Sequence, residues 1–438
     1  MAQIPLVPGQ LEQKLKKSMS LPQSLAVAFH QIVGAGIVAL TGVAIALTGG
    51  GAPIAFVLAA VAVIIYSIPY AALASAMPMT GGMYRYPTRI FNPSLGYAVV
   101  WMFIALEASI SIYALTAAQY IHALFPTIPS MPVAVGILTL FFLLNLAGAA
   151  ISSSIGVVMA VIMVAAFLTY VGFGIPHIHW ATFSNLAPNG VTGLLTAAAL
   201  MTFATGGGTV AAELGGEMKK PHRDIPIAII GGTVVAAILY VLIVTPSTSV
   251  LPIKVVAGQP LTLVAQHTMP YAVYLWFIVG GAIMAVIATM NAALLWGTKS
   301  VLMAVEDGWF PKGMGAVNKR FGTPHFLLLI LYAVGLVPIL TGLNIGIIAS
   351  AGAGFGQLIF IAPIVGSYVM RHRFPELVEK APFKLNRWLH LALVVLAVMI
   401  NCYLAYLLFK SLTGEVLIAL AVWVAAGVAW YAIRYPRR

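Results

Sequence analysis

Long runs of apolar residues, separated by short polar segments, occupy most of this chain. A run of about 18 residues or more is long enough to cross the hydrocarbon core of a bilayer as an α-helix. Hydrophobic residues make up 61% of the chain and charged residues only 7%, whereas soluble domains carry about 25% charged residues. No water-soluble core could bury so much apolar surface, so the sequence predicts an all-α integral membrane protein.

Twelve spans result when the runs are divided at charged residues and at proline- and glycine-rich segments. The fourth and fifth spans are nearly continuous, so eleven or thirteen are alternative counts. The first run lacks the short length and the cleavage site of a signal peptide and is expected to be a transmembrane helix. The predicted spans cover residues 22–48, 52–77, 95–122, 131–149, 151–175, 191–213, 225–247, 270–305, 324–342, 345–370, 387–410 and 414–434.

The positive charges agree with this count. If the N-terminus is cytoplasmic, all but Lys254 and Lys410 of the 22 lysines and arginines fall in cytoplasmic segments, as the positive-inside rule requires. Topology therefore explains the net charge of +12, and nucleic-acid binding is not expected. The chain is predicted to be a multi-pass protein of the plasma or inner membrane with cytoplasmic termini, the first of them formed by residues 1–21.

Two predicted spans are interrupted by glycine: the first at residues 34–36 and the sixth at residues 206–208. Each glycine costs a helix roughly 1 kcal/mol relative to alanine, and each unmade backbone bond in lipid costs several more. Because the interruptions lie five spans apart, they fall at corresponding positions of two halves with opposite orientations, as in inverted-repeat transporters. Close packing of small residues is the alternative explanation. The predicted repeats cover residues 22–175 and 191–370, followed by a cytoplasmic loop at 371–386 and two further spans within 387–434.

A broken helix offers free backbone groups to a ligand. The N–H groups that begin the second half-helix could hold a carboxylate, and the carbonyls that end the first half could accept hydrogen bonds from an ammonium. A zwitterionic amino acid carries both groups, so it needs no charged side chain in the membrane interior. The substrate-binding residues predicted in this way are Ile32, Gly34, Ala35, Gly36, Ile37, Phe203, Ala204, Gly206 and Gly207.

Four short motifs together resemble the amino acid, polyamine and organocation (APC) superfamily of transporters. They are "GAGI" at residues 34–37, "TGGMY" at 80–84, "ELGGEMKKPHRDIP" at 213–226, where Lys220 replaces the usual asparagine, and "EDGWFP" at 306–311. The resemblance covers essentially the whole chain. It implies the leucine-transporter fold, with two five-helix inverted repeats, discontinuous helices 1 and 6, and peripheral helices 11 and 12.

The resemblance also implies a function: transport of amino acids, polyamines or related amines by proton or sodium symport or by exchange. Phe203 matches a position whose aromatic side chain covers the bound substrate in the family. This chain lacks the acidic residue that often follows the sixth-span break, since it has Gly207-Gly208-Thr209 there, which predicts a roomier pocket. It also lacks the lysine that some proton-coupled relatives carry in span five, so the coupling ion stays open.

A few polar residues inside the spans are candidates for ion coupling. Glu107 is the one carboxylate predicted deep in a span outside the broken pair, and it could handle a proton or contact a substrate amine, or else be a structural acid bonded to a neighbouring helix. His30 could titrate near neutral pH, although a buried, neutral histidine is the alternative. Thr289 and Asn291 face either the pocket or a neighbouring helix, and Thr289 could help to hold sodium. Glu213 is expected to pair with Lys219 or Arg223.

These observations predict a secondary transporter, a symporter or an exchanger, that moves an amino acid or related amine by alternating access. The alternatives are a polyamine carrier, a non-transporting sensor with the same fold, and a channel. A polyamine site should hold two or more carboxylates, and Glu107 alone is available by this count. No enzymatic triad or HExxH motif occurs, so no enzyme, cofactor or metal site is expected. The expected partners are a small-molecule substrate and the lipid bilayer; the substrate's identity and the oligomeric state are not predicted.

Overall fold

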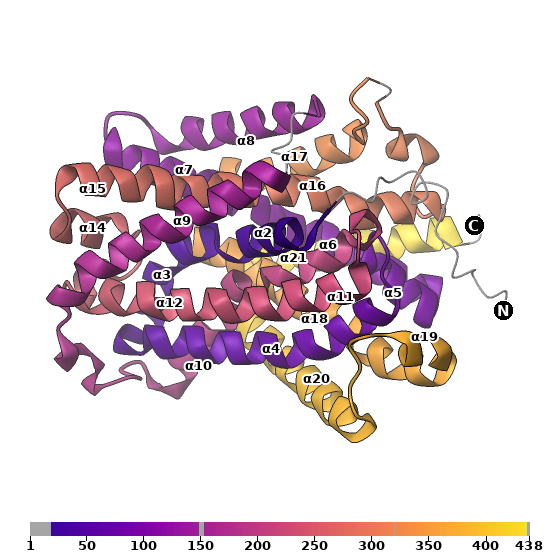
Figure 1. The fold of residues 1–438 in the computed structure, drawn as a ribbon. Helices are drawn as coiled ribbons and strands as arrows, with labels where there is room; N and C mark the ends of the chain where they lie inside the picture. The colour runs from indigo at the N-terminus through magenta and orange to yellow at the C-terminus, as the bar shows by residue number, and fades with distance from the viewer. Residues whose placement is uncertain (1–18, 149–152, 319, 436–438) are drawn as a thin grey trace.

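The computed structural model describes residues 19–148, 153–318 and 320–435 (Figure 1). Most of the predicted N-terminal segment therefore lies outside the described residues, as do the last residue of the predicted fourth span and the first residues of the fifth. Within the described residues all regular structure is helical, and two isolated bridges, Met19 with Met218 and Thr80 with Leu214, are the only strand-like pairings. The predicted all-α fold is confirmed.

Helices up to residue 174 correspond to the predicted first repeat. They are α2 (Leu21–Ile32), α3 (Ala35–Thr48), α4 (Ala52–Ala76), α5 (Gly82–Ile90), α6 (Pro93–Leu106), α7 (Ile110–Leu124), α8 (Ser130–Leu146) and α9 (Ser153–Gly174). Short 3₁₀ segments join some of them, including η1 (Gly49–Gly51) and η2 (Glu107–Ser109).

The remaining helices begin at residue 190. They are α10 (Gly190–Thr205), η5 (Gly206–Glu213), α11 (Pro221–Pro226), α12 (Gly232–Ser249), α13 (Ile253–Val256), α14 (Thr262–Thr268), α15 (Tyr271–Trp276), α16 (Met284–Glu306), α17 (His325–Leu340), α18 (Ile345–Arg373), α19 (Pro375–Lys380), α20 (Arg387–Lys410) and α21 (Gly414–Arg434). The π-helical segments Ile227–Gly231 and Phe277–Ile283 lead into α12 and α16.

The number of membrane crossings agrees with the prediction. The described chain contains nine helical stretches that are long and apolar enough to cross a membrane. The longest of them, Leu21–Ala76, has 56 residues, which at 1.5 Å per residue would extend roughly 80 Å, far more than the hydrocarbon core of about 30 Å. It crosses twice, because the chain turns at Gly49–Gly51, where Gly49 has φ +55°. With the shorter apolar helices α8 and α17, the described residues account for twelve crossings.

Both predicted interruptions are present. The first span is broken between α2 and α3 at Val33 and Gly34. In the sixth span the α-helix ends at Thr205 and the chain continues as the 3₁₀-helix η5 of 8 residues, although 3₁₀ runs longer than three or four residues are uncommon. A third interruption was not predicted: η2 divides the third span into α6 and α7 at Glu107.

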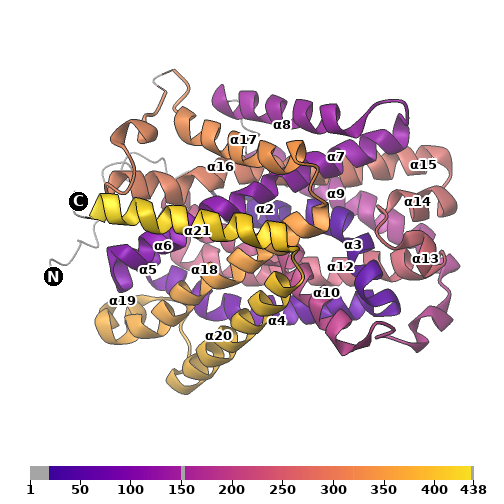
Figure 2. The same cartoon turned by 180° about the vertical axis from the view of Figure 1, so that it is seen from behind.

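The two broken spans lie against each other inside the bundle. α2 packs against η5 and α9, while α10 packs against α3 and α4. The resemblance implied that both of the last two helices are peripheral, but α20 packs extensively on α18 and α4. α21 alone fits that expectation: it lies on the outside of the bundle (Figure 2), and Gly427 is its one buried residue.

The two ends of the bundle differ in charge in the predicted sense. α5, α11 and α19, which carry Arg85, Arg223 and Lys380, gather at the same end as the C-terminal end of α21 (Figure 1). α13, which carries Lys254, lies at the opposite end (Figure 2). The structure thus separates the charges as the positive-inside pattern requires, while the assignment of the first end to the cytoplasm stays a prediction.

Candidate functional site

The break in the first span lies slightly earlier than the glycine pattern predicted. α2 ends at Ile32, Gly34 is nearly extended with φ −148° and ψ −139°, and Ala35 is already the first residue of α3. The N–H groups of Ala35, Gly36 and Ile37 thus belong to the first turn of a helix, where no carbonyl of the same helix can accept from them. They form the kind of anion-binding end that the sequence predicted.

The glycines at the breaks also let the helices approach closely. A Cβ atom on Gly36 would lie 2.6 Å from Cα of Ala204, and one on Gly207 would lie 2.5 Å from the carbonyl carbon of Gln31. Real Cβ atoms essentially never come so close to other heavy atoms, so side chains cannot be added at these positions without moving backbone. Gly36 and Gly207 therefore also have the close-packing role that was the alternative explanation.

Tyr240 of α12 connects the two breaks. Its hydroxyl donates to the carbonyl of Ile32 and lies 3.2 Å from the carbonyl of Ala204. Both carbonyls were predicted to accept hydrogen bonds from a substrate ammonium. In this conformation a protein hydroxyl occupies that position between the half-helices.

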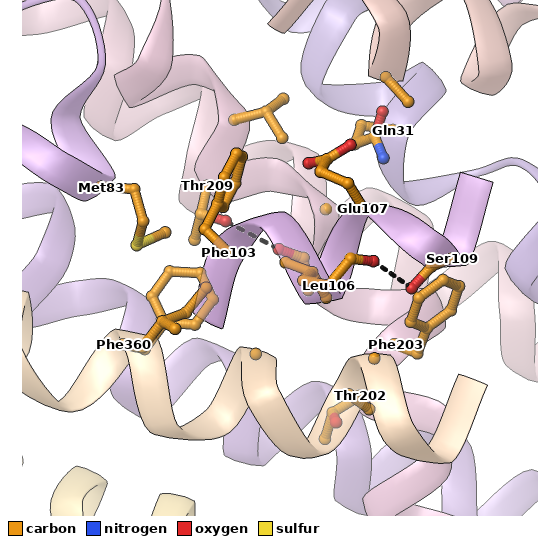
Figure 3. A pocket seen from close by; sticks show the side chains of 18 of the residues that line it. Gln31, Met83, Phe103, Leu106, Glu107, Ser109, Thr202, Phe203, Thr209 and Phe360 are labelled. Atoms are coloured by element: carbon orange, nitrogen blue, oxygen red, sulfur yellow. Dashed lines mark hydrogen bonds between the residues drawn. The ribbon is translucent and has the colours of Figure 1, made fainter. Parts of the chain in front are cut away.

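A cavity of about 110 Å³ lies beside the breaks (Figure 3). It is lined by residues of α2, α4, α5, α6, η2, α7, α10, η5, α16 and α18, and it is rich in aromatic side chains. Among the predicted residues, Phe203, Gly206, Gly207 and Glu107 line it. The other predicted residues are buried but outside its lining: Ile32, Gly34, Ala35, Gly36, Ile37, Ala204, His30, Thr289 and Asn291.

Glu107 projects into this cavity from η2, where the third span changes from α6 to α7 (Figure 3). Its side chain is 4% exposed, and its Oε1 atom has no hydrogen-bond partner among the described residues. A Cβ atom on Gly297 of α16 would lie 2.7 Å from Oε2, so glycine at that position leaves room for the carboxyl group. The alternative was a structural acid bonded to a neighbouring helix, and at Oε1 the described residues make no such bond.

A second carboxyl group, that of Glu213, also lines the cavity. The sequence predicted that Glu213 pairs with Lys219 or Arg223, and this was wrong. Its Oε1 accepts from the backbone N–H of Met83 at 2.6 Å, and its Oε2 accepts from the Ser300 hydroxyl at 2.7 Å. Glu213 thus joins η5 to α5 and α16, and the earlier count of one available carboxylate is corrected to two.

Two ion pairs lie near the junction of α5 with α16. Lys299 pairs with Glu217 at 2.7 Å, and Arg85 pairs with Glu306 at 3.3 Å. The Tyr84 hydroxyl donates to Asp307 at 2.7 Å. These contacts tie α5 and the segment that follows η5 to α16, and Glu213 belongs both to this junction and to the cavity wall.

Two glutamines of the cavity wall were missed by the sequence reasoning. Gln31, one residue after His30, accepts from the Trp296 indole at 3.0 Å and donates to the Tyr113 hydroxyl at 3.2 Å. Gln357 of α18 donates to the Thr202 hydroxyl at 2.7 Å, and its Oε1 has no partner among the described residues. A glutamine within an apolar span was the signal that could have drawn attention to both.

The remaining coupling candidates have structural partners. His30 Nε2 lies 2.7 Å from the Gly156 carbonyl of α9. The Thr289 hydroxyl lies 2.8 Å from the carbonyl of His30, so Thr289 does reach a carbonyl of the first span, as a sodium site would need. Asn291 faces α8 rather than the cavity, and its side-chain oxygen accepts a hydrogen bond from Asn145 of α8 at 3.4 Å.

Similarity to known proteins agrees with this architecture. Residues 19–433 match the model of the family described as amino acid permease. The branched-chain amino acid permease BcaP of Bacillus subtilis is 27% identical over 72% of both chains, and the methylthioribose transporter of the same species is 24% identical over 96% of this chain and 95% of its own. The low-affinity putrescine importer PlaP of Escherichia coli is 26% identical over 81% of this chain and 80% of its own. The chain therefore belongs to the amino acid permease family of the APC superfamily, and it is a multi-pass membrane transporter of small molecules, not an enzyme.

Proposed function

We propose that this protein is a secondary transporter of an amino acid or a closely related amine in the plasma or inner membrane, and that it works by alternating access. The observation that carries the proposal is the buried Glu107 carboxyl group, which faces a cavity beside two broken helices without a partner for Oε1. An ionisable side chain costs about 2.5–3.5 kcal/mol at the centre of a membrane helix. A ligand or a proton that meets this carboxyl offsets that cost.

The half-helices give the substrate's two ends different surroundings. Its ammonium group lies against Glu107 and the start of η5, where the aromatic ring of Phe203 also borders the cavity. Its carboxylate is held by the first-turn N–H groups of α3. Those groups lie outside the cavity lining here, because Gly36 packs against Ala204. Substrate binding therefore requires α3 and α10 to separate slightly, and this is the movement with which the transport cycle begins.

The second candidate function is polyamine transport, and one observation favours it. Glu107 and Glu213 both line the cavity, which meets the expectation of at least two carboxylates for a polyamine. A sensor with the same fold is the third candidate. It would bind the same ligands but would not carry them across the membrane.

The experiment that tests the proposal is uptake and exchange by the purified protein in liposomes. A full panel of labelled amino acids and polyamines is offered with imposed proton or sodium gradients. We expect saturable uptake or counterflow of at least one amino acid. Binding without flux would identify a sensor, flux of polyamines alone would identify the second candidate, and neither binding nor flux would refute the proposal.

Replacing Glu107 with glutamine is expected to abolish accumulation driven by a proton gradient, since an amide of almost the same shape cannot gain and release a proton. Exchange at saturating substrate should persist, because exchange requires no net proton movement. Uptake is compared with and without the gradient in the same liposomes. Glu415→Gln in α21 is the matched control, because Glu415 is exposed at the start of that helix; proton-driven accumulation by Glu107→Gln at the control level would contradict the proton role.

A further inference from the structure

We infer that the substrate is a small molecule with two cationic nitrogen groups, either a basic amino acid or an aliphatic diamine. The inference rests on the proposed function and narrows it. Its basis is the charge of the cavity wall: of the described residues, Glu107 and Glu213 line the cavity and no lysine, arginine or histidine does. A neutral amino acid offers one ammonium group to these two acids, whereas a substrate with two cationic groups can offer one to each.

Two hydrogen-bond acceptors in the cavity wall are left without a partner among the described residues. Oε1 of Glu107 and Oε1 of Gln357 are buried oxygens without a partner among the described residues, and both are acceptors. The donors of Gln31, Trp296 and Thr209, in contrast, are used within the protein. Buried acceptors without donors are costly, so the ligand that completes this cavity brings N–H donors.

The two acceptors come from different walls. Glu107 lies on η2 under Gly297 of α16, while Gln357 lies on α18 and bonds to Thr202 of α10. Figure 3 shows Glu107 and Thr202 on opposite sides of the turn that carries Leu106 and Ser109. One ammonium group therefore cannot meet both acceptors, whereas a ligand with two groups that carry N–H donors offers one to each.

Aromatic side chains form a large part of the cavity wall. Phe103 and Trp296, with ring centroids 5.7 Å apart, border the cavity beside Glu107. Tyr66 and Phe360 stack at 5.1 Å in another part of its wall. Aromatic faces attract ammonium groups through cation–π contacts and also cover methylene groups. The wall therefore offers ring faces for the amines and apolar surface for the methylenes between them.

Competition in liposomes tests the inference. Uptake of labelled arginine and labelled putrescine is measured, each against unlabelled lysine, ornithine, putrescine, leucine and alanine. We expect the dibasic compounds to compete at concentrations about tenfold or more below those of leucine and alanine. The experiments with labelled arginine and with labelled putrescine distinguish a basic amino acid from an aliphatic diamine as substrate. Selectivity for either class supports the inference.

Variants of Glu107 show whether the charge causes that selectivity. Glu107→Gln should raise KM for dibasic substrates about tenfold or more, and by clearly more than it raises KM for any weakly transported neutral amino acid. Glu107→Asp, which keeps the charge, should retain the preference, and Glu415→Gln should behave as wild type. Thermal melting in detergent confirms that each variant is folded.

The outcomes also separate this inference from the proposed function. Selective transport of leucine or another neutral amino acid overturns the inference and leaves the proposed function standing. Equal effects of Glu107→Gln on neutral and dibasic substrates likewise overturn it. Failure to transport any amino acid or polyamine overturns both.

Discussion

Alanine in place of Gly207 is expected to lower the rate of transport in liposomes by about 100-fold or more. The added methyl group would lie 2.5 Å from the carbonyl carbon of Gln31 and 2.8 Å from the backbone nitrogen of Ile32. Overpacking in a protein interior costs about 1–3 kcal/mol when side chains can adjust. Here the neighbours are backbone atoms at the end of α2, so the broken helices themselves must separate, and the free groups at the first break lose their position.

The matched control for this change is Gly172→Ala in α9. A Cβ atom at Gly172 meets nothing within 4 Å, so the same chemical substitution should leave transport unchanged and strengthen the helix slightly. Both variants are compared at equal amounts of reconstituted protein, after size-exclusion chromatography shows that they are folded. Transport by Gly207→Ala at the rate of Gly172→Ala would show that contact between the two breaks is not needed.

Removal of the Tyr240 hydroxyl by substitution with phenylalanine is expected to lower transport about 10- to 100-fold. The ring stays in place against Phe56, with which it makes an edge contact at 5.5 Å between centroids. The carbonyls of Ile32 and Ala204 lose the donor that lies between them. A buried acceptor left without its partner costs about 1–3 kcal/mol, and here the cost falls on the ends of the half-helices that must move during transport.

The same variant should also unfold at a lower temperature, which thermal melting of the detergent-solubilised protein measures. Tyr406→Phe provides the comparison, because Tyr406 is 56% exposed on α20 and is far from either break along the chain. If Tyr240→Phe transports and melts as Tyr406→Phe does, the hydroxyl does not stabilise the junction of the breaks.

Much of this architecture follows from local sequence. Apolar runs indicate the crossings because an apolar helix of sufficient length has no other stable environment. Glycine triplets in two spans five apart predict the two discontinuous helices. The first break was predicted at residues 34–36 and lies at Val33 and Gly34, because the pattern identifies glycines while the helix end is set by hydrogen bonds at Ile32 and Val33. Glu107 was found because a lone carboxyl in an apolar span is conspicuous.

The rest of the site depends on distances between helices, which no local pattern contains. Gln357 and Thr202 are 155 positions apart in the chain and meet only because α18 packs against α10. Glu213 was paired with nearby cations because a local pattern shows neither the conformation of the residues after the sixth-span break nor the helices that they meet. The structure instead makes residues 206–213 a 3₁₀-helix, and its final carboxyl group reaches both the cavity wall and the junction of α5 with α16.

The long 3₁₀ segment at the sixth-span break is longer and more tightly wound than an α-helix of the same number of residues. A 3₁₀-helix rises about 2.0 Å and turns about 120° per residue, against about 1.5 Å and 100° for an α-helix. Over the 8 residues of η5, conversion to α-helix would shorten the segment by about 4 Å and rotate its end by about 160° relative to α10. Such a rewinding would carry Glu213 off the cavity wall and pull it from Met83 and Ser300 in one motion. A local change of backbone hydrogen bonding in η5 would thus both shift and rotate its end relative to α5.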